Sequence, residues 1–193
     1  MTIALKTLVS FNVTNGAVPY GSLITDANGD LFSTTAEGGA YNGGVVFEIT
    51  KTATGYASTP TTLVSFNGAN GGRPLGSLIA GANGDLFGTT GFGGPNNRQG
   101  TVFEIARTTT GYASVPTTLV SFNGTNGSYL CGSLIADASG DLFGTTMNGG
   151  ANGVGTVFEI VKTAAGYASA PTILVSFNGS NGAYPGPTGS LKP

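Results

Sequence analysis

The side chains best suited to chemistry in this sequence are carboxylates that recur at regular intervals. The first group is the stretch Asp26-Ala27-Asn28-Gly29-Asp30, whose oxygens are of the kind that bind Ca²⁺ in short loops. The next copy of the stretch has Gly81 in place of Asp26, and no bidentate Glu follows at loop spacing. We therefore expect no metal, and we expect the last Asp of each copy to hydrogen-bond the backbone of a turn. These residues are Asp30, Asp85 and Asp141.

A second set of carboxylates lies inside the predicted strands, at Glu48, Glu104 and Glu159. One carboxylate per copy could form an acidic ring or a pair of acid and base groups. Catalytic sites are ordinarily single and asymmetric, whereas these Glu residues occur once in every copy. The pattern therefore favours a repeated structural hydrogen bond, to backbone amides or Thr hydroxyls of a neighbouring strand, and we predict no catalytic residue.

The composition removes further kinds of chemistry. The chain has no His, which is the commonest general base and a frequent metal ligand. Its single cysteine, Cys131, can form neither an internal disulfide nor a thiolate zinc site, and we expect a small buried hydrophobe. Seven Lys and Arg against nine Asp and Glu give a formal net charge of -2, which offers no basic surface to nucleic acid or anionic lipid. We predict no enzyme, no cofactor, no nucleic-acid partner and no membrane insertion.

The elements that position these residues are repeated along the chain. The word Leu-Val-Ser-Phe-Asn occupies residues 8–12, 63–67, 119–123 and 174–178, so its Phe returns after 55, 56 and 55 residues. The words Gly-Asp-Leu-Phe and Val-Phe-Glu-Ile each occur three times with the same period. The 193 residues therefore hold about three and a half copies of a unit of about 55 residues, which is typical of propellers and other repeat architectures.

Each copy predicts four short antiparallel strands. In the first copy these are residues 22–25, 31–34, 45–50 and 61–66, which are rich in β-branched and aromatic residues and are separated by Gly, Asn and Pro. The Asn-Gly pair between the first two strands predicts a type I′ turn, with positive φ at both residues. Apolar side chains on both faces of the third strand suit a sheet that packs between two others. The fold class is therefore all-β and β-propeller-like, with four-stranded antiparallel blades.

The repeat boundaries divide the chain into five segments. Residues 1–20 hold a spare outer strand and a linker, residues 21–67, 68–123 and 124–178 hold blades 1, 2 and 3, and residues 179–193 begin an incomplete fourth repeat. Propellers have about four to eight blades, and three blades leave two apolar faces uncovered. We therefore expect the chain to associate with itself, most simply as a dimer that closes a six-bladed ring, with a fibre as the alternative.

The repeat words resemble those of a known family. In the second copy they read Gly-Ser-Leu-Ile at 76–79, Gly-Asp-Leu-Phe-Gly-Thr-Thr at 84–90, Gly-Gly at 93–94 and Gly-Thr-Val-Phe-Glu-Ile at 100–105. Words in this order resemble the Gly-rich tandem repeat named GloVer, of Gloeobacter/Verrucomicrobia type, over nearly the whole chain. The resemblance implies a propeller-like bacterial protein that is extracellular or attached to the cell surface, without established catalytic residues. The sequence itself shows neither a signal peptide nor a C-terminal anchor.

Candidate binding residues are sought in the loops where the copies differ, because loops on a rigid scaffold commonly carry function. The longer and more variable loops join the second strand to the third and one blade to the next, whereas the opposite end has only tight hairpins. The candidate ligand-binding residues on these loops are Tyr20, Tyr41, Arg73, Phe92, Asn96, Arg98 and Tyr129. The Tyr of the recurring Gly-Tyr-Ala-Ser word is expected to fasten a hairpin.

Two functions are consistent with this sequence. The first is a non-enzymatic repeat module that completes a ring with copies of itself and acts as a structural or interaction scaffold. The second is a lectin-like propeller with carbohydrate sites repeated at the blade junctions. Tyr and Asn among Gly suit a sugar ligand, while the absence of Trp counts against one.

Overall fold

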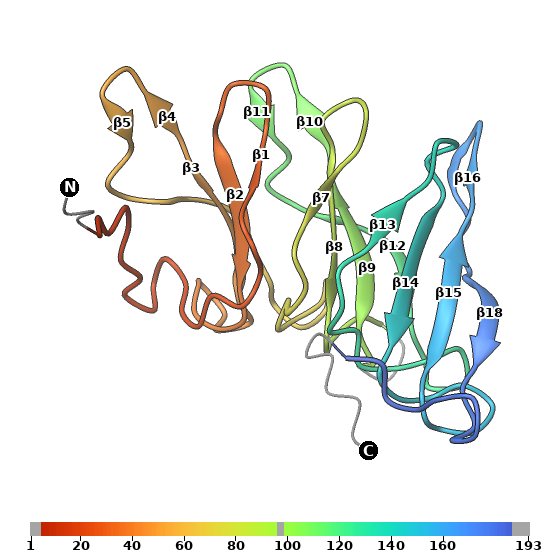
Figure 1. Cartoon of the computed structure of the whole chain (residues 1–193). Helices are drawn as coiled ribbons and strands as arrows, with labels where there is room; N and C mark the ends of the chain where they lie inside the picture. The colour runs from red at the N-terminus through yellow and green to blue at the C-terminus, as the bar shows by residue number, and fades with distance from the viewer. Residues whose placement is uncertain (1–4, 96–98, 187–193) are drawn as a thin grey trace.

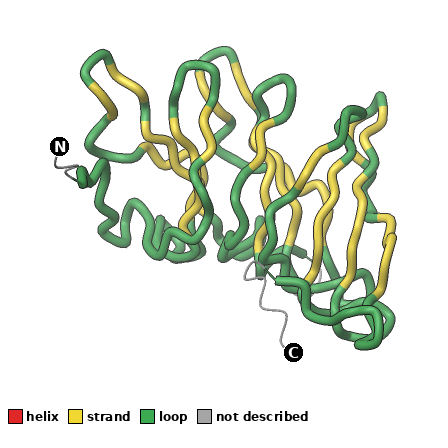
Figure 2. Tube along the Cα trace, in the orientation of Figure 1, coloured by secondary structure: helices red, strands yellow, loops and turns green. Residues whose placement is uncertain are grey.

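The computed structural model describes residues 5–95 and 99–186 of the chain. This part consists of strands and connecting loops (Figure 2). Each complete copy of the repeat forms one four-stranded antiparallel sheet, and the three sheets stand side by side in chain order (Figure 1). We call these sheets blades 1, 2 and 3. The predictions of an all-β fold and of four antiparallel strands per copy are confirmed.

The strands follow one another in the same way in every blade, and the sheet orders are β1-β2-β3-β6, β7-β8-β9-β12 and β13-β14-β15-β18. Blade 1 comprises β1 (Ile24–Thr25), β2 (Leu31–Thr35), β3 (Val45–Ile49) and β6 (Thr61–Ser65). Blade 2 comprises β7 (Ile79–Ala80), β8 (Leu86–Thr90), β9 (Thr101–Ile105) and β12 (Thr117–Ser121). Blade 3 comprises β13 (Ile135–Ala136), β14 (Leu142–Thr146), β15 (Thr156–Ile160) and β18 (Thr172–Ser176).

A short two-stranded hairpin projects from each blade between its third and fourth strands. These hairpins pair β4 (Lys51–Thr52) with β5 (Gly55–Tyr56), β10 (Arg107–Thr108) with β11 (Gly111–Tyr112), and β16 (Lys162–Thr163) with β17 (Gly166–Tyr167). They lie at the same end of the blades as the first hairpin of each sheet, and the Gly-rich loops gather at the other end (Figure 1). No helix in the described ranges is long and apolar enough to cross a membrane.

The first hairpin of blade 1 contains a different turn from the predicted one. Gly29 has a φ of 83°, while Asn28 is not among the residues with positive φ, so the predicted type I′ turn is wrong. The Gly29 amide donates to the Asp26 carbonyl oxygen (3.1 Å), and the Asp26 amide donates to the Asp30 carbonyl oxygen (3.1 Å). This is the longer hairpin connection, in which a type I turn is followed by one left-handed Gly. The Asp26 side chain stabilises it by accepting the amides of Asn28 and Asp30, each at 3.0 Å.

The apolar core lies between the blades. Val46, Val64 and Phe66 on one face of blade 1 belong to the same buried cluster as Phe103 and Ile105 of blade 2. A second cluster joins blade 2 to blade 3 in the same way. Because each blade has one apolar face toward the preceding repeat and one toward the next, burial depends on a neighbour at both sides.

One aromatic contact repeats at each of these boundaries. The Phe of the Leu-Val-Ser-Phe-Asn word packs edge-on or tilted against the Phe of the next copy's third strand. The pairs, with their ring-centroid distances, are Phe66–Phe103 (5.1 Å), Phe122–Phe158 (4.9 Å) and Phe11–Phe47 (5.0 Å). Residues 5–12 pair with no sheet, so they are not the predicted strand, but Phe11 lies on β3 as Phe66 lies on β9.

Candidate functional site

Two cavities lie at the junctions between neighbouring blades. The cavity between blades 2 and 3 has a volume of about 690 Å³, and the cavity between blades 1 and 2 has a volume of about 370 Å³. Each is lined by the first hairpins of both blades and by the projecting hairpin of the second. Both cavities therefore lie at the hairpin end of the blades, opposite the Gly-rich loops.

A tyrosine of the projecting hairpin packs across each junction. The ring pairs are Tyr112 with Phe32 (5.3 Å between centroids) and Tyr167 with Phe87 (5.5 Å). The Arg107 guanidinium lies 4.6 Å from the centre of the Tyr112 ring, and Lys162 Nζ lies 5.8 Å from that of Tyr167. Burial raises the pKa of both phenols, so they are neutral at physiological pH. The recurring Tyr thus fastens a hairpin, as predicted, and the surface that it holds is the preceding blade.

The recurring Asp residues hold the two hairpins of a blade together. Their Oδ1 atoms accept the backbone amide of the first residue of the projecting hairpin. The bonds are Asp30 to Lys51 (2.6 Å), Asp85 to Arg107 (2.6 Å) and Asp141 to Lys162 (2.5 Å). Within the described residues, no three His, Cys, Asp or Glu side chains gather as a metal ion requires. The predicted backbone bond is therefore present, but it joins two hairpins, while the turn itself is held by Asp26 and Asp137.

Two of the strand Glu residues, Glu48 and Glu104, lie near these Asp residues. Burial raises the pKa of the Glu104 carboxyl, and so do the nearby charge of Asp85 and a hydrogen bond to its side chain, while Lys162 lowers it. Burial also raises the pKa of Glu48, and the charges of Asp30 and Asp26 add to this effect. In the described part of the chain, the amide-binding carboxylates at this end of the blades are those of Asp. Among the described residues no amide or Thr hydroxyl donates to Glu48, Glu104 or Glu159, so the predicted bond of these Glu residues is wrong, and the amides at this end are bound by Asp.

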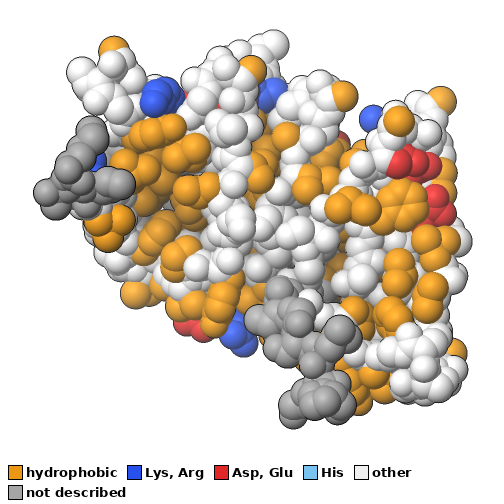
Figure 3. Space-filling model, viewed as in Figure 1, with side chains coloured by type: hydrophobic (Ala, Val, Ile, Leu, Met, Phe, Trp, Pro, Cys, Tyr) orange, Lys and Arg blue, Asp and Glu red, His pale blue; other side chains and the backbone are white. Residues whose placement is uncertain are grey.

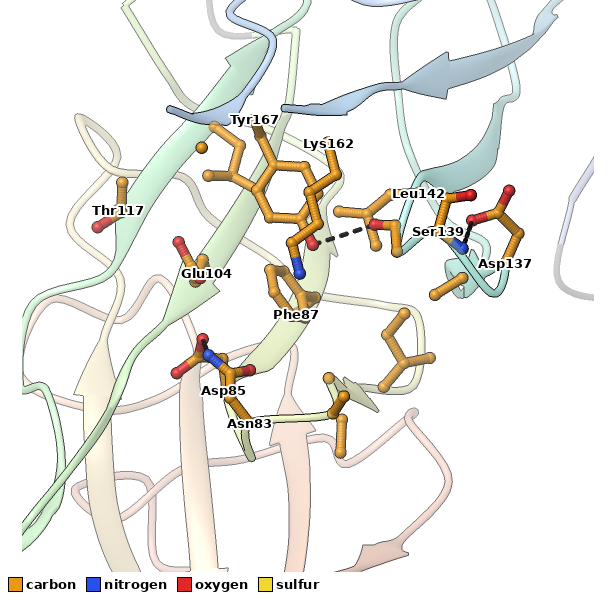
Figure 4. A pocket seen from close by; sticks show the side chains of 18 of the residues that line it. Asn83, Asp85, Phe87, Glu104, Thr117, Asp137, Ser139, Leu142, Lys162 and Tyr167 are labelled. Atoms are coloured by element: carbon orange, nitrogen blue, oxygen red, sulfur yellow. Dashed lines mark hydrogen bonds between the residues drawn. The ribbon is translucent and has the colours of Figure 1, made fainter. Parts of the chain in front are cut away.

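The cavity between blades 2 and 3 contains groups of several kinds (Figure 4). Asp85 and Glu104 bring carboxyl oxygens from blade 2, and Lys162 and Tyr167 bring an amine and an aromatic ring from blade 3. The Asn83 side-chain amide donates to the Asp85 carboxylate, and the Tyr167 hydroxyl donates to the Gly140 carbonyl oxygen (3.2 Å). The arrangement offers hydrogen-bond acceptors, donors and an apolar surface around one space.

Three of the residues predicted on the loop face come together there. Phe92 and Tyr129 pack edge to face with ring centroids 5.0 Å apart, and the Arg73 guanidinium lies 5.6 Å from the centre of the Phe92 ring. Arg73 also lies 4.0 Å from the Glu37 carboxylate. These side chains form a small exposed ledge across the boundary between blades 2 and 3, and the two cavities lie elsewhere.

The other predicted residues are not assembled with that ledge. Tyr20 and Tyr41 are exposed, at 65% and 66% of their surface, and neither lines a cavity. Asn96 and Arg98 lie outside the described residues. Cys131 is buried, as predicted, and burial raises the pKa of its thiol.

A comparison with protein families identifies the repeat. The family model described as the Gloeobacter/Verrucomicrobia repeat matches residues 1–191, which include all three blades. The chain belongs to this family. The resemblance read from the repeat words is therefore confirmed. A comparison with curated proteins gave no match.

The cavity residues of this Gloeobacter/Verrucomicrobia repeat protein were not among the predicted binding residues. Asp85, Glu104 and Tyr167 recur in every copy, and a recurring residue was interpreted as structural. The sequence did contain one usable signal, because Gly81 replaces the Asp found at the same position in the other two copies. That substitution lies at the rim of the larger cavity.

Proposed function

We propose that this chain is a non-enzymatic, propeller-forming module that associates with copies of itself to complete a ring. In this proposal it serves as a structural or interaction scaffold of a bacterial surface or secreted protein. Support comes from the family, from the stacked four-stranded blades, and above all from the outward face of blade 3.

The outward face of blade 3 exposes side chains that are buried at the other two boundaries. Val175 is 37% exposed, whereas the equivalent Val64 and Val120 are 1% and 2% exposed. On the same blade Ile135 and Leu174 are 67% and 49% exposed. Hydrophobic side chains are visible at this end of the molecule in Figure 3. A contiguous apolar face of this kind marks an interaction site, and this is the observation that carries the proposal.

The partner that fits this face is a second copy of the chain. The buried boundaries show that such a face packs on the third strand of a following blade, and β3 of blade 1 is the strand of that type in a second copy. In the single chain, residues 5–12 cover β3, where Val9 and Phe11 contact Val45, Phe47 and Ile49. Because residues 8–12 and 174–178 have the same sequence, the partner's outer strand can replace this segment with equivalent contacts.

Sedimentation velocity of two charge variants tests the proposal. Val175→Asp places a carboxylate in the proposed interface, so we expect the associated species to dissociate into single chains. Val115→Asp alters an apolar side chain that is 71% exposed outside that face, so it should leave the association unchanged. An unchanged distribution for Val175→Asp, with a native melting transition, would contradict the proposal.

A lectin-like activity is a second candidate, favoured by the cavities at both blade junctions. Their volumes, about 690 and 370 Å³, are of the order of small-ligand pockets, roughly 300–1,000 Å³. Carboxyl, amide and hydroxyl groups beside an aromatic ring suit the hydroxyl groups and the apolar face of a sugar. A glycan array probed with the labelled chain tests this candidate, and the absence of binding to any glycan would reject it.

A further inference from the structure

The two junction cavities differ in one contact between the blades. At the junction of blades 1 and 2, Arg107 Nη1 lies 3.5 Å from Asp26 Oδ2. Lys162 occupies the place of Arg107 at the next junction, but the place of Asp26 is taken by Gly81. Among the described residues no ion pair forms there, and the cavity is about 690 Å³ instead of about 370 Å³.

Gly81 is not required by the backbone at its position. Its φ is not positive, and blades 1 and 3 have Asp26 and Asp137 there, each accepting the amides of its turn. A Cβ at residue 81 would lie 2.9 Å from the Phe87 ring, so a side chain there would press on the wall of the cavity. Residue 81 therefore lacks both the carboxylate and the side-chain volume that Asp26 and Asp137 have at the equivalent positions.

The absence of that carboxylate changes which charged groups of the cavity are available to a ligand. Lys162 Nζ lies near the Tyr167 ring, and among the described residues its ammonium group has no carboxylate within ion-pair distance. Across the cavity lie the carboxyl groups of Glu104 and Asp85, and Thr117 and Ser139 add hydroxyl groups. Figure 4 shows these labelled groups arranged around one space and contributed by both blades.

The charge of this lining selects among ligand classes. Three carboxyl groups, those of Asp85, Glu104 and Asp137, stand against the one amine of Lys162, so an anion gains little, and the lining contains no basic cluster to hold a phosphate. Acceptors, donors and an aromatic surface in one space match a ligand that has several hydroxyl groups and no net charge. A neutral saccharide has this chemistry.

We propose that the cavity between blades 2 and 3 is the single saccharide site of the chain, opened by Gly81, and that the Asp26–Arg107 ion pair closes the equivalent site. The proposal rests on the second candidate function above and goes beyond it, because a lectin with repeated sites would bind at both junctions. It also assigns the bound class, a neutral oligosaccharide, to named residues.

Isothermal titration calorimetry of the full chain tests this proposal. The probes are neutral oligosaccharides ending in glucose, galactose, mannose or N-acetylglucosamine, with a uronic-acid oligosaccharide as the charged comparison. We expect one equivalent of a neutral probe per chain. Gly81→Asp should weaken that binding by about tenfold or more, because it supplies a partner for Lys162 and fills the rim. Asp26→Gly should free Arg107 and raise the stoichiometry to two.

The outcomes separate this inference from the function on which it rests. Two equivalents in the unaltered chain, preference for the uronic-acid probe, or binding that neither variant alters would overturn the single-site assignment but leave a lectin. No binding of any probe would overturn both. Glu37→Ala, on the opposite loop face, is the matched control and should leave affinity and stoichiometry unchanged. If Gly81→Asp unfolds the chain, the stoichiometry of Asp26→Gly decides the question.

Discussion

The backbone amide of Ser77 donates a hydrogen bond to Oγ of Ser133, 2.9 Å away across the boundary between blades 2 and 3. The amide of Ser22 makes the same bond to Oγ of Ser77 at 2.8 Å. A Cβ on Gly76, the residue before Ser77, would lie 2.5 Å from the Gly132 carbonyl oxygen. The Gly-Ser word of the repeat therefore supplies both the bond between neighbouring blades and the space that allows their first strands to approach.

This relationship predicts different effects of one substitution at two equivalent glycines. Gly76→Ala forces the Gly132 backbone to move, so we expect a loss of roughly 1–3 kcal/mol of unfolding free energy. At Gly132 the nearest atom to an added Cβ is Thr145 Oγ1, at 3.2 Å, so Gly132→Ala should cost much less. Urea unfolding of the two variants, at a concentration where the chain is monomeric, measures the difference. Equal losses would show that the close approach is not the cause.

Gly132→Ala should instead weaken self-association. In the proposed ring the first strand of a partner's blade 1 approaches Gly132 as Gly132 itself approaches Gly76, so an added methyl group meets the partner's backbone. We expect the variant to keep the melting temperature of the monomer and to associate only at higher concentration, measured by sedimentation equilibrium. Unchanged association would place the interface elsewhere.

Val13 is predicted to destabilise the chain at a position where the other copies have glycine. Its φ is 72°, and the equivalents Gly68, Gly124 and Gly179 have φ values of 86°, 90° and 87°. A β-branched residue in this region is strained by about 1–2 kcal/mol. Val13→Gly should therefore raise the unfolding free energy by about 1 kcal/mol in urea titrations.

The reciprocal variant is the control for Val13. Gly124→Val adds a side chain where no atom lies within 4 Å of a Cβ, so only the backbone strain changes. We expect a loss of about 1 kcal/mol or more. A gain from Gly124→Val, or a loss from Val13→Gly, would show that strain does not govern this position.

Glu104 makes stability depend on pH. Its pKa in the folded chain is raised above 4.5, first by burial and then by Asp85. The folded state therefore binds the proton more tightly than the unfolded state, and this contribution is fully present below the unfolded pKa and is lost as pH rises through the folded pKa. Glu104→Gln cannot ionise, so its stability should fall less than that of the parent chain between about pH 4 and about pH 7.

Thermal melts across that pH range measure this effect. At about pH 7 we expect Glu104→Gln to melt above the parent chain, because no charged carboxylate is then buried beside Asp85. Glu37→Gln changes only an exposed carboxylate 4.0 Å from Arg73 and should leave the pH profile nearly unaltered. Parallel pH profiles of Glu104→Gln and the parent chain would contradict the assignment.

The local features of the fold could be predicted from the sequence, and the features that depend on neighbouring blades could not. Strand alternation and turn residues act over a few positions, which is why the strands near 31–35 and 45–49 were predicted almost to the residue. The turn type was missed because the Asn-Gly pair does not decide it. The same backbone bonds and left-handed Gly occur in blade 2, where Gly81 replaces Asp26, so the length of the connection sets the turn.

The candidate site depends on distances between copies. Phe92 and Tyr129 were predicted to share one face, and they do come into contact, although 37 positions separate them. The larger cavity could not be predicted, because it forms where hairpins of two blades meet, and the sequence does not give the distance between blades. The effect of Gly81, the loss of an ion pair between blades, can be recognised only from the contact of Arg107 with Asp26 in the structure.

Light scattering of the unaltered chain in solution tests the central claim, self-association through the open face of blade 3, most directly. The account predicts a molar mass that is a multiple of 19.1 kDa, and twice that value for a six-bladed ring of two chains. A mass of 19.1 kDa at every concentration, together with one cooperative melting transition, would contradict it.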